Sequence, residues 1–313
     1  MITIPRRTAS ALTQVFLQED INFLLTNRIP RRYATLLIGW FSRIRSRRLA
    51  RLSVATWSLF DDLRLDEART LDFSSLRDCF VRELREGARR IDPDPCTVTS
   101  PCDAVVGAFG CVQADQAIQA KGFPYSVKDL LADEQLVERH RGGKFVTLRL
   151  RASMYHRFHA PCDGRVRRVN YISGDTWNVN PIALSRVERL FCRNERAILP
   201  LEVSITGSHL TLVPIAAILV ASIRLHFIPT ALDLKHHGIA EIPCDASFVK
   251  GQELGYFENG STIVMFASND FEFSDNLVEG STIRVGEALF RHSAPISQPS
   301  RRAKKGDNDE QSD

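Results

Sequence analysis

The feature that most constrains the fold is a change in sequence pattern near residue 93. Beyond it, short runs rich in β-branched and aromatic residues alternate with turn residues such as Asp163-Gly164 and Asn259-Gly260. The predicted strands cover residues 105–109, 145–150, 165–172, 197–205, 210–225, 262–266 and 282–285. One helix is predicted within this half, over residues 129–140. Residues 93–299 are therefore expected to form a β-rich catalytic core.

Residues 1–92 follow a helical pattern instead. Between residues 34 and 52, apolar side chains recur at spacings of three and four among arginines, which is typical of an amphipathic helix. Residues 73–88 predict a further helix, with Ser74 or Ser75 as its N-cap. We therefore expect an α+β protein with an N-terminal amphipathic helical region over residues 1–92. Residues 300–313, whose one apolar side chain is an alanine, are predicted to be a disordered tail.

Charge is unevenly distributed along the chain. The net charge of the 313 residues is only +4, which by itself does not argue for a nucleic-acid partner. Residues 1–51, however, carry ten arginines against Glu19 and Asp20, so this segment alone carries +8. Arginines beside apolar side chains suit an anionic membrane surface, although the same helix could instead pack on the core with its arginines in water. The longest mostly apolar run, residues 210–223, is shorter than the roughly 20 residues that a spanning helix needs.

The densest group of reactive side chains lies in residues 154–164, which include His156 and His159. Histidines can act as acid and base at neutral pH, or simply pack beside a turn. A metal site is not predicted, because no carboxylate or thiolate stands at a supporting spacing and the seven cysteines are scattered. Upstream, Asp103 follows a proline-containing turn, where an aspartate most often serves only the turn itself.

The tripeptide Gly-Ser-Thr occurs twice, at residues 260–262 and 280–282. Each copy could form a hairpin turn that leads into a strand. Alternatively, the serine hydroxyl attacks the carbonyl of the preceding glycine and converts the peptide bond to an ester, because glycine tolerates the distorted backbone that this attack requires. Elimination then leaves dehydroalanine, which hydrolyses to a pyruvoyl group, an electrophilic carbonyl made without an added cofactor. Spacing alone does not separate the two copies.

Four motifs together give the chain a family resemblance. They are Tyr155-His156-Arg157-Phe158-His159-Ala160-Pro161-Cys162-Asp163-Gly164, Gly174-Asp175 with Val179-Asn180-Pro181, Leu190-Phe191-Cys192-Arg193-Asn194-Glu195-Arg196, and Lys250-Gly251-Gln252-Glu253-Leu254-Gly255-Tyr256-Phe257 leading into Gly260-Ser261-Thr262. With these motifs in this order, the chain resembles the bacterial phosphatidylserine decarboxylases of the longer, membrane-associated kind, from about Glu19 to Phe290. Members of this family are self-processing pyruvoyl enzymes of the carboxy-lyase class, made as zymogens.

The resemblance also implies roles for individual residues. The family's processing serine corresponds to Ser261, so cleavage is expected between Gly260 and Ser261, whereas the second Gly-Ser-Thr copy corresponds to a structural turn. Asp103 and His159 correspond to the acid and base of a processing triad with Ser261. His156 corresponds to the residue that assists decarboxylation. Ser261 would itself become the pyruvoyl group.

The implied activity belongs to phospholipid biosynthesis. Phosphatidylserine would be converted to phosphatidylethanolamine and CO2 through a Schiff base with the pyruvoyl group, without metal or pyridoxal phosphate. Cleavage at 260/261 would give fragments of 260 and 53 residues that stay together as a heterodimer, with any higher oligomeric state left open.

Phosphatidylserine and an anionic membrane surface are the expected partners, and nucleic acid is not. The expected location is peripheral, on the cytoplasmic face of the bacterial inner membrane. Two alternatives remain beside this interpretation. One is a pyruvoyl decarboxylase of another amine substrate. The other is an uncleaved lipid-binding relative, which would run as one band of 35.3 kDa on a denaturing gel.

Overall fold

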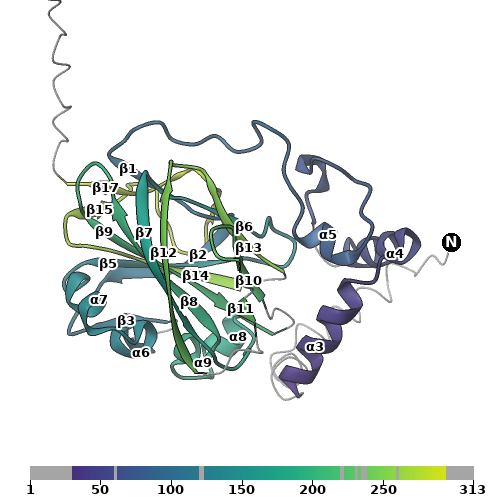
Figure 1. Ribbon diagram of the computed structural model, residues 1–313, viewed down its shortest axis with the longest axis horizontal. Helices are drawn as coiled ribbons and strands as arrows, with labels where there is room; N and C mark the ends of the chain where they lie inside the picture. The colour runs from purple at the N-terminus through teal and green to yellow at the C-terminus, as the bar shows by residue number, and fades with distance from the viewer. Residues whose placement is uncertain are drawn as a thin grey trace, which may run out of the picture.

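The computed structural model describes residues 30–59, 62–119, 123–218, 222–229, 232–233, 238–258 and 261–293. Within these residues, a large antiparallel sheet is accompanied by smaller sheets and a few short helices (Figure 1). The expected α+β class is therefore confirmed. The predicted tail over residues 300–313 lies outside the described residues, as do Asn259 and Gly260 of the expected cleavage segment.

The core is built on one sheet of eight strands, paired antiparallel throughout. In spatial order the strands are β12 (Ile239–Phe248), β7 (Gly164–Ile172), β8 (Arg196–Val203), β9 (His209–Ala216), β14 (Ser261–Ala267), β5 (Lys144–Arg149), β2 (Ala104–Cys111) and β16 (Thr282–Ile283). Along β14, Ile263 and Met265 enter one hydrophobic cluster, while Val264 and Phe266 enter another, because successive side chains point to opposite faces of a sheet. β14 is thus a central strand that is buried on both faces.

A second sheet contains β11 (Leu232–Asp233), β10 (Ser222–Leu225), β13 (Glu253–Phe257) and β6 (Arg157–His159). The strand predicted over residues 210–225 is therefore two strands in two sheets. The division is tertiary in origin, because Ile223 pairs with Phe257 of β13 and not with the large sheet. The remaining strands are β1 (Thr97–Thr99), β17 (Ala288–His292) and β15 (Phe271–Phe273) in one sheet, and β3 (Gln116–Ile118) and β4 (Pro124–Ser126) in another.

The N-terminal helices are shorter than predicted. They are α3 (Arg31–Ser42), α4 (Arg47–Trp57), the 3-10 turn η1 (Leu65–Glu67) and α5 (Leu76–Phe80). The single amphipathic helix expected over residues 34–52 is interrupted, because extended Ser46 turns the chain and caps α4 with its hydroxyl. Ser75 caps α5, as predicted, but this helix ends well before residue 88, since Ala68 and Leu84 form an antiparallel bridge instead.

Within the β-rich half, the helix expected over residues 129–140 is replaced by α6 (Val127–Leu131) and α7 (Glu134–Arg139). Ala132 adopts a left-handed conformation with φ of 50°, which ends α6. Asp133 then caps α7 by accepting the N–H groups of two following residues. Two further helices, α8 (Pro181–Leu184) and α9 (Leu190–Arg193), were not expected, because four residues are too few to show a helical period.

The N-terminal helices lie on the side of the core that carries β6, β10 and β13 (Figure 1). At the start of α3, Arg31 forms an ion pair with Asp175 (2.5 Å), and its guanidinium lies 3.8 Å from the ring centre of Trp177. Just after the end of α3, Arg43 forms an ion pair with Glu258 (2.6 Å). α3 is therefore fixed to the core at both ends. None of the described helices is long and apolar enough to span a membrane.

Candidate active site

His159 lies on β6, with its backbone N–H donating to the carbonyl of Pro101 (2.8 Å). Its ring nitrogens have two different partners: Nδ1 lies 2.8 Å from the Gly251 carbonyl, and Nε2 lies 3.0 Å from the Tyr155 hydroxyl. A carbonyl only accepts, so Nδ1 carries the proton and Nε2 accepts from Tyr155. Burial lowers the pKa of His159, although the Gly251 carbonyl partly opposes that shift. His159 is therefore neutral at pH 7, with a lone pair on Nε2, the form that a general base requires.

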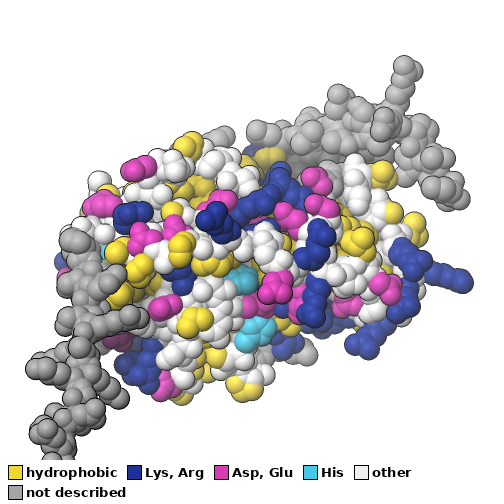
Figure 2. Space-filling model, turned by 90° about the horizontal axis from the view of Figure 1, so that it is seen from above, with side chains coloured by type: hydrophobic (Ala, Val, Ile, Leu, Met, Phe, Trp, Pro, Cys, Tyr) yellow, Lys and Arg dark blue, Asp and Glu magenta, His cyan; other side chains and the backbone are white. Residues whose placement is uncertain are grey.

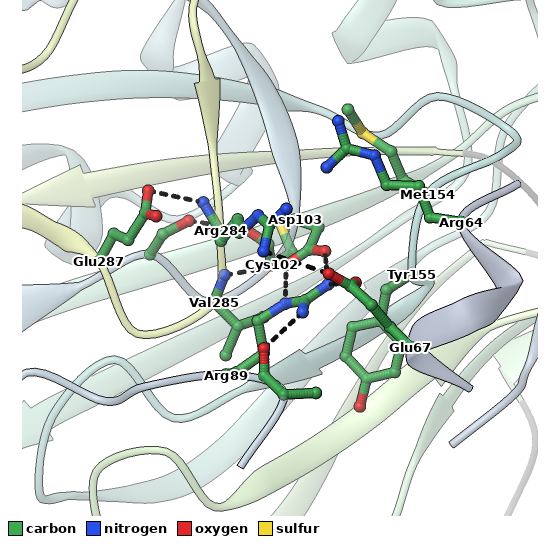
Figure 3. Close-up of polar contacts among 12 residues, drawn as sticks. Arg64, Glu67, Arg89, Cys102, Asp103, Met154, Tyr155, Arg284, Val285 and Glu287 are labelled. Atoms are coloured by element: carbon green, nitrogen blue, oxygen red, sulfur yellow. Dashed lines mark hydrogen bonds and ion pairs between the residues drawn. The ribbon is translucent and has the colours of Figure 1, made fainter. Parts of the chain in front are cut away.

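Asp103 stands just before β2, and its carboxylate is held by Arg89 through Nε (2.9 Å) and through a second guanidinium nitrogen. The backbone N–H of Val285 donates to the same carboxylate (3.0 Å). Arg89 also donates to Glu67 (2.8 Å), and Arg284 forms an ion pair with Glu67 (3.2 Å). Figure 3 shows Arg89 between the two carboxylates. We call Arg89, Arg284, Glu67 and Asp103 the Asp103 cluster.

The structure brings Asp103 and His159 near each other without joining their side chains. The Pro101 carbonyl that receives the His159 N–H is only two residues from Asp103. Among the described residues, no hydrogen bond links the two side chains, and the ring of His159 is oriented by Gly251 instead. The charge of Asp103 still acts at a distance, since it raises the pKa of His159 against the effect of burial.

His156 is fully buried, and neither of its ring nitrogens has a hydrogen-bond partner of ordinary geometry in the described part of the chain. Its ring meets Phe80 edge-on, with 5.9 Å between the ring centres. Burial, together with the nearby charge of Arg82, lowers the pKa of His156 to about 3. The His156 carbonyl accepts the Phe257 N–H (3.0 Å), which places this histidine beside β13, close along the chain to the expected cleavage segment.

The two Gly-Ser-Thr copies occupy different positions. Ser261 is the first residue of β14 and pairs with Ala216 of β9. In the second copy, Gly280 has a positive φ of 85° and the Ser281 hydroxyl donates to the Val278 carbonyl (2.6 Å). The second copy is therefore a turn that leads into β16, where only glycine adopts the required backbone without strain.

Glu258 follows β13 and carries a feature that sequence analysis missed. Its side chain is 7% exposed, and three arginines converge on it: Arg43 at 2.6 Å, Arg77 at 2.9 Å and Arg224 at 3.7 Å. Burial alone would raise the pKa of Glu258, but the hydrogen bonds and charges of Arg43 and Arg77 lower it overall. We call these four residues the Glu258 cluster. Nothing in the local sequence signals it, because Arg43 stands 215 residues away.

A second group of Ser, His and Asp side chains lies apart from these residues. Nε2 of His292 is 3.1 Å from Asp270 and 3.3 Å from the Ser208 hydroxyl. A relay of the triad type uses two different ring nitrogens, one facing the serine and one facing the carboxylate. Because a single nitrogen faces both partners here, we interpret this group as structural.

A metal ion or a lysine amine would add further chemistry to such a site. The described residues contain no group of three or more His, Cys, Asp or Glu side chains placed to hold a metal ion. Lys250 precedes Gly251, but its ammonium donates to the backbone carbonyls of Asp92 (3.2 Å) and Asp94 (2.5 Å). That amine therefore fastens the linker before β1 to the core.

Comparison with known proteins decides the family. Residues 76–291 match the family model described as phosphatidylserine decarboxylase. The chain belongs to the phosphatidylserine decarboxylase family. The resemblance noted in the sequence is thereby confirmed, and the chain is an enzyme of a carboxy-lyase family. The matched region contains Asp103, His156, His159 and Ser261, together with both carboxylate clusters except Arg43 and Glu67.

Relatives in this phosphatidylserine decarboxylase family align over most of the chain. One from Aliivibrio fischeri is 33% identical over 274 residues, covering 83% of this chain and 91% of its own length. One from Vibrio cholerae is 34% identical over 277 residues, covering 85% and 96%. One from Haemophilus influenzae is 31% identical over 270 residues, covering 83% and 92%. All three are named phosphatidylserine decarboxylase proenzyme, and the word proenzyme describes a protein that is processed before it acts.

Proposed function

We propose that this chain is a phosphatidylserine decarboxylase that cleaves itself between Gly260 and Ser261. Family membership and the names of its relatives support the substrate and the processing. The observation that carries the proposal is the state of the two histidines. His159 is held as a neutral base with its lone pair on Nε2, while His156 is fully buried and neither of its nitrogens makes a hydrogen bond of ordinary geometry among the described residues.

For the processing step, we propose that the Ser261 hydroxyl attacks the Gly260 carbonyl while Nε2 of His159 takes its proton. The Tyr155 hydroxyl must first give up its hydrogen bond to Nε2. The Gly251 carbonyl keeps the Nδ1 proton in place, and the charge of Asp103 stabilises the imidazolium that forms. The resulting ester eliminates, which releases the Gly260 carboxylate and leaves dehydroalanine. Addition of water then gives a pyruvoyl group and ammonia.

A buried hydroxyl beside Ser261, and a buried histidine beside β13, fit such a group. The Thr262 hydroxyl, next to Ser261, is buried and has no hydrogen-bond partner in the described structure. Neither nitrogen of buried His156 makes a hydrogen bond of ordinary geometry there. When formed, the pyruvoyl group would supply a carbonyl that takes the substrate amine and delocalises the electron pair left on the α-carbon when CO2 departs. The negative charge of the bound substrate would raise the pKa of His156, which could then return a proton to the α-carbon.

The sheet also supports the expectation that the two fragments stay together. Cleavage at 260/261 would place β14 in the small fragment, between β9 and β5 of the large one. Ile263, Val264, Met265 and Phe266 in that strand are fully buried. Separating the fragments would expose this apolar surface to water, at about 1.5–3 kcal/mol for each large side chain.

We further propose that the enzyme binds an anionic membrane surface peripherally, on the cytoplasmic face. Four large side chains of α3 are exposed at helical spacing: Tyr33 (77%), Leu36 (51%), Leu37 (61%) and Trp40 (64%). Lys and Arg side chains project beside hydrophobic ones at the end of the molecule where the N-terminal helices lie (Figure 2). Of the apolar side chains between residues 34 and 52, Trp40 and Leu52 are exposed, whereas Phe41 and Ile44 are half-buried.

A denaturing gel of the purified protein tests the proposed function. We expect fragments of 260 and 53 residues, a small fragment that resists Edman sequencing because its N-terminus carries no amine, and release of phosphatidylethanolamine from phosphatidylserine. Ser261→Ala should remain one band. A wild-type protein that stays at 35.3 kDa would instead support the lipid-binding alternative. Cleavage with turnover of a different amine would support the other alternative.

A further inference from the structure

One face of the β10–β13 pair gathers polar side chains. In the antiparallel register, Arg224 lies opposite Tyr256. Two positions further along, past the Ile223–Phe257 pair, the Glu258 N–H donates to the Ser222 carbonyl (3.4 Å), so Ser222 and Glu258 are opposite each other as well. Because alternate residues of a strand share a face, these four side chains lie together. The opposite face carries buried apolar side chains such as Ile223 and Phe257.

The N-terminal helices bring two more arginines to this polar face. Arg77, in α5, reaches Glu258 through Nε (3.1 Å) and a terminal nitrogen (2.9 Å), and also donates to the Tyr256 hydroxyl (3.4 Å). Arg43, after α3, reaches the other carboxylate oxygen (2.6 Å). Three guanidinium groups therefore share one carboxylate. The Glu258 cluster carries a surplus of two positive charges.

Two donors on β10 make no hydrogen bond in the described structure. Nε of Arg224 is buried and has no hydrogen bond, since its 3.7 Å separation from Glu258 is too long for one. The Ser222 hydroxyl has no partner in the described structure either, and its residue is only 2% exposed. A buried donor without a partner is costly, and native structures rarely tolerate it without a reason. Neither the Ser222 hydroxyl nor Nε of Arg224 donates a hydrogen bond to Glu258, so holding that carboxylate in place does not explain them.

We infer that Ser222 and Arg224, supported by the charges of Arg77 and Arg43, form a subsite for the phosphodiester of the lipid headgroup. This inference rests on the proposed function. A phosphodiester supplies one negative charge and two acceptor oxygens, which match a hydroxyl, a guanidinium N–H and a positive field.

The carboxylate of the same headgroup is the poorer occupant. It must leave as CO2, and an arginine bound to it would stabilise the ground state more than the transition state.

The subsite lies within reach of the reacting centre. Glu258 is three residues before Ser261, so their Cα atoms are at most roughly 11 Å apart in the uncleaved chain. The phosphodiester of a serine phospholipid is only a few bonds from the α-carbon that loses CO2. An arginine side chain spans the remaining distance, so one substrate can occupy both places.

Kinetics of the processed full-length enzyme test this subsite with two substrates. One is a short-chain, water-soluble phosphatidylserine, and the other is an O-acylserine, which keeps the amine and carboxylate but lacks the phosphodiester. For Arg224→Gln we expect KM for the phospholipid to rise about 10- to 100-fold, the effect of losing one charge-assisted hydrogen bond, with kcat within about twofold. KM for the O-acylserine should not change. Ser222→Ala should show the same pattern with a smaller rise.

The matched control is Arg165→Gln, which removes another arginine–carboxylate pair, with Asp245, on exposed parts of β7 and β12. It should behave as wild type with both substrates. Inorganic phosphate should inhibit the wild-type enzyme competitively, and its inhibition constant should rise in Arg224→Lys, which keeps the charge but not the planar fork.

Two outcomes would overturn the subsite. If Arg224→Gln impairs both substrates equally, or neither, the arginine does not bind the phosphodiester. If the variant slows self-cleavage while the processed fraction keeps its KM, the arginines serve the carboxylate that cleavage creates at Gly260. A wild-type protein that neither cleaves nor turns over phosphatidylserine would instead contradict the proposed function itself.

Discussion

The two carboxylate clusters differ in their ratio of arginines to carboxylates. In the Asp103 cluster, Arg89 and Arg284 face two carboxylates, so the ion pairs balance. In the Glu258 cluster, three arginines face a single carboxylate. A balanced cluster holds side chains in place and adds little net field, whereas a surplus of positive charge around one buried carboxylate favours an anionic ligand. By this difference in charge, the Asp103 cluster is suited to hold side chains in position, and the Glu258 cluster is suited to bind an anion.

Both clusters also depend on the N-terminal region. Glu67 and Arg89 reach the core at Asp103, while Arg43 and Arg77 reach it at Glu258. The division into a helical region over residues 1–92 and a core over residues 93–299 stays a prediction. These ion pairs indicate that the two parts share the site.

The largest expected effect concerns processing beside the Asp103 cluster. His159→Ala should abolish self-cleavage, and Asp103→Asn should slow it at least about 100-fold, because general-base catalysis and its charge stabilisation are lost. His156→Ala should cleave normally but lose most decarboxylation. Gel densitometry against time measures the first effect, and phosphatidylethanolamine release measures the second. Normal cleavage by His159→Ala would contradict the assignment, and cleavage blocked only in His156→Ala would exchange the two roles.

The next effect is an asymmetry in stability between the clusters. At Asp103 the shared group is Arg89, whereas at Glu258 it is the carboxylate. Arg89→Met should cost about 3 kcal/mol, since it leaves the buried carboxylate of Asp103 without its ion pair. Glu258→Gln should cost less, about 2 kcal/mol, because the arginines that lose their partner are partly exposed to water. Arg43→Met should cost less than about 1 kcal/mol, because this side chain is 56% exposed.

Urea unfolding in a Ser261→Ala background, which keeps every variant a single chain, measures these differences. If Arg43→Met and Glu258→Gln lower the free energy of unfolding equally, the Glu258 cluster carries no surplus of positive charge.

A smaller effect is expected between pH 7 and pH 5, and it arises from buried histidines and not from Glu258. Burial lowers the pKa of His156 and of His140 to about 3, so the unfolded chain, with a histidine pKa near 6.5, binds more protons below that pH. Stability therefore falls as pH falls, by about 2 kcal/mol per histidine at pH 5. The lowered pKa of Glu258 keeps it charged across this window, so its contribution is lost only in stronger acid.

Urea unfolding at the two pH values, in the Ser261→Ala background, checks this expectation. His140→Gln should lose less stability than its parent between pH 7 and pH 5, by about 2 kcal/mol. An identical loss in the variant and its parent would mean that His140 is not held neutral by burial.

The smallest effect concerns the exposed apolar side chains of α3, none of which belongs to either cluster. Leu37→Ser and Trp40→Ser should weaken binding to anionic vesicles several-fold, because each removes an apolar contact with the lipid. Leu71→Ser is the matched control, since Leu71 is 66% exposed but lies outside α3. Vesicle co-sedimentation at low and high salt measures the change. Unchanged binding in both α3 variants would assign the membrane contact to another surface.

Sequence patterns predicted the local parts of this structure well. Strand alternation located β5, β7 and β14 closely, and the serine before α5 was recognised as its cap. Patterns failed where tertiary contacts override them, as at Ala132, whose left-handed backbone divides a predicted helix, and at Ile223, which pairs into a second sheet. The residues near the site also fall into those that the sequence indicated and those that only tertiary contacts revealed. The histidines stood out as a motif, whereas Tyr155 and Gly251 became meaningful only as partners of the His159 ring.

The sequence by itself determined the β-rich core, the basic helical region and the two Gly-Ser-Thr candidates, because side-chain period, capping and backbone freedom act over a few neighbouring residues. Only the tertiary structure decided that the ring of His159 is oriented by a carbonyl, and that Arg43 and Arg77 meet Glu258 across 215 and 181 residues of chain. Charges carry no periodic signal, and any of the 41 lysines and arginines could have paired with that carboxylate. The tertiary fold decides which arginines pair with Glu258. It thereby sets the sign and strength of the electrostatic field beside the expected cleavage segment.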